Sequence, residues 1–173
     1  GDVYDHEKSM NFETIQSKYD RATYAAEESA KRKIEKQTLG GEYVKSLEEV
    51  TIANFFFLNG IRYEYEKLYP FESDDPMRKA YRPDFYLPDY DLYIEHFGVN
   101  KENRLPWLSS IEEQKYLEGM QWKRAFHKQN GTRLFETYSY YSSEGRLLTE
   151  LDAMLKKNGV KIGSAMESIS ESP

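Results

Sequence analysis

Two acidic residues, Asp84 and Glu95, stand on the two arms of a short predicted β-hairpin in the middle of the chain. If the turn is centred between Asp89 and Tyr90, the pairing places Asp84 opposite Glu95 on one side of the sheet. Cross-strand neighbours have Cβ atoms about 5 Å apart, and like charges at that spacing destabilise a sheet. A divalent cation relieves the repulsion, and hard carboxylate oxygens suit Mg²⁺ or Mn²⁺. The spacing therefore predicts a metal site at Asp84 and Glu95.

The alternative is a register that slips by one residue, which would make both acids solvated surface groups. The surroundings of Glu95 favour the metal site, because Ile94 and Phe97 are apolar and an unpaired acid is costly within a buried strand. The same alternation places Phe85 and Ile94 on the opposite face, where they would enter the core.

A third acid, Glu49, lies on a predicted helix and shares its face with Ile52 and Phe56. Ser46 and Glu49 have the spacing of a capping box, so Glu49 is either a first-turn capping residue, a metal ligand that points into a cleft, or both. Its neighbour Glu48 points roughly 100° away on helical geometry and is expected to be solvated.

The elements that must position these acids follow a break at residues 39–41, Leu-Gly-Gly, which is the predicted domain boundary. The order of elements predicts an α/β fold, with a small mixed central β-sheet flanked by helices. The predicted helices are 46–58, 110–129 and 144–157, and the predicted strands are 61–67, 81–86, 92–97 and 132–139.

The chain is expected to divide into an N-terminal helical arm at 1–42, a domain at 43–160 and a flexible tail at 161–173. Residues 12–36 carry a thin apolar stripe at helical spacing, which predicts an arm that packs against the domain or a neighbour. Because the chain starts with Gly and not Met, we expect a fragment of a longer protein.

The composition excludes several classes of protein. The 173 residues include no Cys, which excludes a disulfide scaffold, Cys-based zinc sites and a thiol nucleophile. There is no apolar run long enough to cross a membrane and no apolar signal segment, so a cytoplasmic protein is expected. The net charge of −6 argues weakly against a protein that coats nucleic acid, but acids gathered for a metal would contribute to it.

In order along the chain come Ser46-x-x-Glu49 on a helix, then Arg82-Pro83-Asp84-Phe85, then a strand that carries an apolar-flanked Glu95. This set resembles the PD-(D/E)XK nuclease superfamily, which has the restriction-endonuclease-like fold. Residues 43–158 look more specifically like the nuclease-like domains found within bacterial UvrD/Rep-type superfamily 1 DNA helicases.

The resemblance implies a restriction-endonuclease-like core that hydrolyses DNA phosphodiesters with Mg²⁺ or Mn²⁺. It also implies helicase domains in the same parent chain and a role in DNA repair or processing, on single-stranded or branched DNA. Asp84 matches the Pro-Asp of the motif, Glu95 its second acid and Glu49 the acid of the first core helix. All three would be catalytic and would hold the metal.

The chain departs from the motif at Phe97, where the superfamily expects Lys two residues after the second acid. Some members supply this Lys from a nearby helix. Lys123, on the helix that follows the catalytic strand, is therefore the candidate catalytic cation, and Lys115 is a weaker one.

DNA would be held by basic residues of the same helix, with Trp122 and Phe126 as either core residues or base-stacking platforms. The candidate nucleic-acid contacts are Lys115, Arg124, His127 and Lys128.

Two other interpretations stay open. Phe97 in place of Lys favours a catalytically inactive nuclease-fold module that binds DNA or docks a protein. The acids could also be structural features of an unrelated α/β domain.

Overall fold

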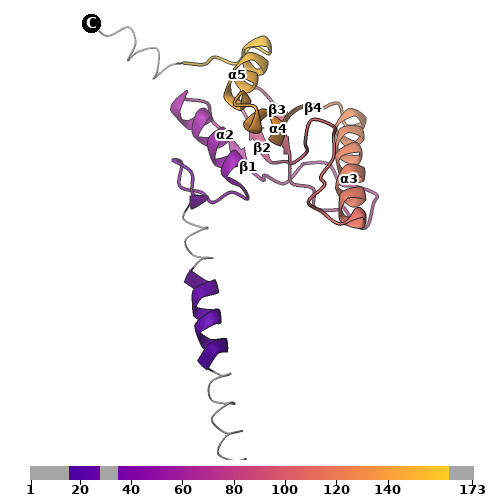
Figure 1. The fold of residues 1–173 in the computed structure, drawn as a ribbon. Helices are drawn as coiled ribbons and strands as arrows, with labels where there is room; N and C mark the ends of the chain where they lie inside the picture. Colours follow the sequence, from indigo (N-terminus) through magenta and orange to yellow (C-terminus); the bar gives the residue numbers. More distant parts are fainter. Residues whose placement is uncertain (1–15, 28–34, 164–173) are drawn as a thin grey trace, which may run out of the picture.

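The computed structural model describes residues 16–27 and 35–163 of the chain. The described domain is mixed α/β, with a four-stranded sheet in the order β1-β2-β3-β4 (Figure 1). The first three strands are antiparallel neighbours, whereas β3 and β4 run parallel. The strands are β1 (Glu64–Tyr65), β2 (Phe85–Leu87), β3 (Leu92–Phe97) and β4 (Arg133–Tyr138).

Helices cover both faces of this sheet (Figure 1). On one face, Ile52 and Phe56 of α2 and Leu151 of α5 pack with Phe85 and Ile94. The labelled helices are α2 (Leu47–Leu58), α3 (Ser110–Gln129), α4 (Ser139–Ser143) and α5 (Leu147–Lys157).

The other face carries α3 and two smaller clusters. Tyr81, Tyr93 and Phe126 form one, and Phe97 and Met120 belong to the other. Because alternate residues of β3 contribute to the two faces, Tyr93 and Phe97 point toward α3 while Ile94 points toward α2. Glu95 shares the parity of Tyr93 and therefore lies on the α3 side.

The predicted hairpin register is confirmed, since Phe85 pairs with Ile94 and Leu87 with Leu92. The helix at 110–129 is confirmed with its bounds, and the helix after Ser46 runs to Leu58 as expected.

The strand predicted at 92–97 has the predicted bounds, whereas the strands predicted at 61–67, 81–86 and 132–139 are shorter than expected. The strand predicted at 61–67 is reduced to Glu64–Tyr65, and it ends there because Glu66 has a φ of 52° and leaves the extended conformation. The second strand begins only at Phe85, directly after Pro83 and Asp84, and Pro has no N–H to donate to a ladder.

The last predicted helix, 144–157, begins later than expected. A short helix, α4, precedes Gly145, whose φ of 69° separates it from α5.

Of the predicted arm helix at 12–36, residues 16–27 are helical and exposed. Residues 12–15 and 28–34 of that prediction, and 164–173 of the predicted tail, lie outside the described residues. Within the described ranges, no helix is both long and apolar enough to span a bilayer.

Candidate functional site

Asp84 and Glu95 form the centre of the candidate site, and the sheet register brings them together as predicted. Both are buried, with 3% and 1% of their surface exposed. The backbone N–H of Asp84 donates to Glu95 Oε1 at 3.2 Å, and the N–H of His96 donates to Asp84 Oδ2 at 2.8 Å. Each carboxylate is therefore fixed by a backbone donor of the opposite strand.

Two lysine ammonium groups contact these acids. Lys123 Nζ, from α3, lies 3.1 Å from Glu95 Oε2, so the structure places the sequence-predicted cation beside the second acid. Lys45 Nζ lies 3.0 Å from Asp84 Oδ1 and 3.5 Å from Glu66 Oε1. Sequence reasoning missed Lys45. The available signal was its position directly before the capping Ser46, which places it at the start of α2 beside the acids.

The carboxylates are strongly perturbed by burial and by one another. Burial, followed by the charge of Asp84, raises the pKa of Glu95 to about 7, although Lys123 acts in the opposite direction. Burial and then Asp84 also raise the pKa of Glu49 above its ordinary value. Burial opposes the charge of Lys45, but Asp84 and Glu49 outweigh it and raise the pKa of the ammonium. The site thus concentrates negative charge that needs cations.

Of its two predicted roles, Glu49 has that of a capping residue in the first turn of α2. Its backbone N–H donates to Ser46 Oγ at 3.1 Å, which caps α2. Its own carboxylate is 4% exposed and accepts from the Ser46 hydroxyl and the Tyr65 hydroxyl, each at 3.2 Å. Glu49 lines the same cavity as Lys45, whose ammonium group contacts Asp84.

The chemistry of the donor set fits a hard divalent cation at Asp84 and Glu95, which are two buried carboxylates on a rigid hairpin. Among the described residues, no group of three or more His, Asp or Glu side chains is arranged to hold a metal ion. Glu49 therefore does not complete a three-ligand cluster in this arrangement, and its role as a third ligand stays a prediction.

Phe97, at the position of the motif Lys, is a core residue. It is 1% exposed and packs with Val99, Leu105 and Met120. Lys123 Nζ lies 5.6 Å from the centre of its ring, within the range of a cation–π contact. The ammonium group of Lys123 therefore contacts both Glu95 and the ring of Phe97.

A chain of hydrogen bonds through Tyr81 and His127 holds the Oε1 atom of Glu95. The Tyr81 hydroxyl donates to Glu95 Oε1 at 3.0 Å and lies 2.9 Å from His127 Nε2. His127 Nδ1 lies 2.7 Å from the Thr132 hydroxyl. Burial and the charge of Lys123 lower the pKa of His127 to about 4, so the imidazole is neutral near pH 7. The network then assigns the proton to Nε2, which donates to Tyr81.

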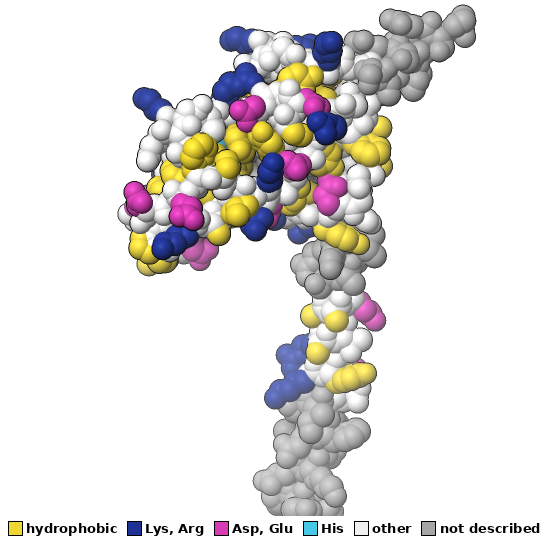
Figure 2. Space-filling view, turned by 180° about the vertical axis from the view of Figure 1, so that it is seen from behind, with side chains coloured by type: hydrophobic (Ala, Val, Ile, Leu, Met, Phe, Trp, Pro, Cys, Tyr) yellow, Lys and Arg dark blue, Asp and Glu magenta, His cyan; other side chains and the backbone are white. Residues whose placement is uncertain are grey.

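This network corrects the prediction that His127 contacts nucleic acid, because its side chain is 1% exposed and serves Tyr81 instead. Arg124 also has a partner, since its guanidinium binds both carboxylate oxygens of Glu136 at 2.6 to 3.0 Å. Lys115 and Lys128 are exposed, as a surface contact requires. On the face shown in Figure 2, basic and acidic side chains are interspersed, so charge alone marks no binding surface there.

The expectation that Glu48 is solvated is wrong. Its carboxylate accepts from His96 Nε2 and from the Ser139 hydroxyl, each at 2.7 Å. These bonds lower the pKa of Glu48, the His96 bond most of all. His96 points away from Glu95, because successive residues of β3 alternate between the two faces of the sheet, and its Nδ1 lies 2.8 Å from the Thr137 hydroxyl.

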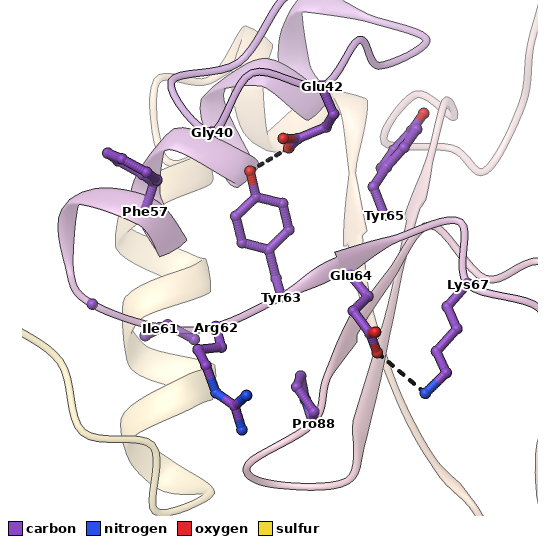
Figure 3. Close-up of a pocket in the computed structure, with 11 residues that line it drawn as sticks. Gly40, Glu42, Phe57, Ile61, Arg62, Tyr63, Glu64, Tyr65, Lys67 and Pro88 are labelled. Atoms are coloured by element: carbon purple, nitrogen blue, oxygen red, sulfur yellow. Dashed lines mark hydrogen bonds and ion pairs between the residues drawn. The ribbon is translucent and has the colours of Figure 1, made fainter.

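Lys45, which contacts Asp84, lines two cavities, although neither Asp84 nor Glu95 is among the residues that line them. One, of about 520 Å³, lies between α3 and the segment before β2, and the other, of about 230 Å³, lies beside Glu49 and His96. A larger cavity of about 820 Å³ lies at the edge strand β1 (Figure 3). Its walls carry Tyr63, hydrogen-bonded to Glu42, and Lys67, paired with Glu64, but none of the three candidate acids.

No family model, curated protein or solved structure matches this chain. The residues of the site, their contacts and their burial are therefore the basis for its function.

Proposed function

We propose that this domain hydrolyses DNA phosphodiesters in a metal-dependent reaction, on a restriction-endonuclease-like core. The observation that carries the proposal is the pair of acids itself. Asp84 and Glu95 face each other across a hairpin, are buried, and each accepts a hydrogen bond from a backbone N–H. The ammonium group of Lys123 lies 3.1 Å from Glu95. Two like charges held this close inside a protein are costly, and a site that binds a cation explains why the fold retains them.

Asp84 and Glu95 would hold the cation, with Mg²⁺ or Mn²⁺ as the candidates. Such an ion lowers the pKa of bound water and stabilises negative charge on phosphate oxygens. Lys123 supplies a further positive charge beside Glu95, where it can orient water or stabilise a developing oxyanion. The Tyr81–His127 pair keeps Glu95 Oε1 in place while Oε2 faces Lys123.

The resemblance to helicase-associated nuclease domains supports a setting beside helicase domains of the same parent chain, in cytoplasmic DNA repair or processing. Such a setting would supply single-stranded or branched DNA to the site.

Calorimetry and a cleavage assay test this proposal together. Wild-type protein is expected to bind Mn²⁺ or Mg²⁺, and Asp84→Ala to lose that binding. Cleavage of single-stranded and branched DNA is expected to require the metal and Asp84. Absence of metal binding in the wild type, or binding that Asp84→Ala leaves unchanged, would refute the proposal.

A second candidate is a catalytically inactive module that binds DNA or docks a protein. It is favoured by the two ion pairs, because Lys45 and Lys123 already neutralise Asp84 and Glu95, and by the missing third ligand among the described residues. DNA binding without cleavage in either metal would support this candidate over the first.

A further inference from the structure

The outer side of α2 is apolar for a helix at the surface of the domain. On its inner side, Ile52 and Phe56 pack in the hydrophobic core. Leu47 and Leu58 lie on the opposite side of the helix and are 56% and 46% exposed. A helix that is apolar on all sides belongs in the interior of a protein. The exposed side of α2 therefore indicates that another element packs over it.

A groove of about 540 Å³ lies on this side, between α2, α5 and the segment that follows α5. Leu148, which is 43% exposed, lines its α5 wall. Phe55 and Ile162 also line the groove, and both pack against the main hydrophobic core. The charged residues of the lining, Asp152 and Lys156, pair with each other at 3.1 Å. The groove is thus an apolar surface without net charge, and an occupant would extend the core outward.

The arm helix, residues 16–27, has an apolar stripe that suits such a surface. Tyr19 is 67% exposed, and Ala22 and Ala26 continue the stripe at helical spacing. An isolated helix of this length is marginal in water, and packing of its apolar face stabilises it. The arm helix and α2 each have 12 described residues, or about 18 Å, so the arm helix matches the wall of the groove in length.

The chain enters the domain beside this groove (Figure 1). The N–H of Leu39 donates to Asn54 Oδ1 at 2.8 Å, and Asn54 lines the groove. The N–H of Val44 donates to the Lys36 carbonyl at 3.0 Å, so a tight hairpin fixes the point of entry. Residues 28–38 join the arm helix to Leu39 and can span about 36 Å when extended, twice the length of the helix. The arm helix is therefore tethered within reach of the groove.

We propose that the arm helix docks in this groove of its own domain, with Tyr19, Ala22 and Ala26 toward Leu58 and Leu148. The arm helix is exposed in the structure, so docking is a second position of the arm. The tether favours this occupant over the arm of a second copy, because a short linker holds the arm at a high effective concentration beside its own groove. The docked position involves no residue of the acid site and stands independently of the proposed function.

Cross-linking between introduced cysteines tests the proposal, because the chain has no Cys of its own. Ala22→Cys is combined with Leu148→Cys and treated with a short bis-maleimide. The matched control combines Ala22→Cys with Glu118→Cys, at an exposed position of α3. A cross-link within one chain is expected to form at least about tenfold faster in the first pair. Equal rates for the two pairs, or a covalent dimer as the main product, would overturn docking in the chain's own groove.

Two further variants separate docking from the closeness that the tether alone creates. In the Ala22→Cys and Leu148→Cys background, Ala26→Asp places a charge in the docked stripe and is expected to slow the cross-link at least about fivefold. Ala25→Asp makes the same change about 100° around the helix, with the same loss of helix propensity, and should slow it less than about twofold. Equal slowing by the two variants, or none by Ala26→Asp, would contradict docking through the stripe.

Discussion

Replacing Glu95 with Gln is expected to remove a pH dependence that the wild-type fold carries. Burial and Asp84 raise the pKa of Glu95 from 4.5 to about 7. Between these values the unfolded chain releases the proton and the folded chain retains it. The folded state therefore binds more protons, and its stability falls as the pH rises through this window. Gln does not ionise, so it resembles protonated Glu throughout.

The size of the effect follows from the difference between the two pKa values. They differ by roughly 2 to 3, and each unit corresponds to about 1.4 kcal/mol, which gives about 3 kcal/mol in full. Roughly 1 kcal/mol is already lost at about pH 5, so the change between about pH 5 and pH 8 is about 2 kcal/mol.

His127 acts in the opposite direction. Its pKa is lowered from 6.5 to about 4, so the unfolded chain takes up a proton first as the pH falls. The fold therefore loses about 2 kcal/mol between about pH 8 and pH 5 through this residue. The two groups nearly cancel in the wild-type curve, and only the difference between wild type and Glu95→Gln isolates Glu95.

Urea unfolding in EDTA at several pH values between about 5 and 8 measures that difference. Glu95→Gln is expected to gain about 2 kcal/mol of stability relative to wild type between about pH 5 and pH 8, on top of a constant offset from the lost ion pair with Lys123. Glu118→Gln, an exposed acid on α3, is the control and should show no such trend. A difference that stays constant within about 0.5 kcal/mol would refute the reasoning that burial and Asp84 control Glu95.

His127→Gln should reduce the loss of stability on acidification by about 2 kcal/mol between about pH 8 and pH 5, as measured by urea unfolding. If His127→Gln lost as much stability as wild type on acidification, the imidazole of His127 would not be held neutral in the folded state. Lys123→Ala should lower the rate of metal-dependent DNA cleavage by about 10²–10³ while calorimetry still detects metal binding, and Lys157→Ala, an exposed lysine of α5, should cleave normally. Equal rates for the two variants would exclude a catalytic role for Lys123. Ser46→Ala removes the α2 cap and should cost about 1 kcal/mol in urea unfolding, against under about 0.5 kcal/mol for exposed Ser143→Ala.

The parts of the site that depend on local periodicity could be predicted from the sequence. The hairpin register followed from the turn centre and the alternation around Ile94, because a slip by one residue would expose the whole apolar set. The Ser46–Glu49 cap has a local spacing that needs no tertiary information. Lys123 was identified from its helix and the resemblance, and the structure places it beside Glu95.

Long-range contacts could not be predicted in this way. Glu48 accepts a hydrogen bond from Ser139, 91 positions away in the sequence, and helical geometry alone made it a surface residue. His127 was counted with the surface cations because its neighbours are basic, yet its ring meets Tyr81, 46 positions away. The helix at Ser139–Ser143 was missed because Ser and Tyr are weak helix formers and indicated a strand end.

The four charges at the centre of the site differ in how firmly they are held. The Asp84 and Glu95 side chains are 4% and 1% exposed, and backbone N–H groups fix them to the sheet. The Lys45 and Lys123 side chains are 62% and 31% exposed, and a flexible stem carries each ammonium group. A divalent cation could therefore replace the ammonium contacts by rotation of two lysine side chains, with no movement of the carboxylates. The ion pairs that favour an inactive module are thus equally compatible with a metal site, and the fixed pair of acids is the feature that both functions must explain.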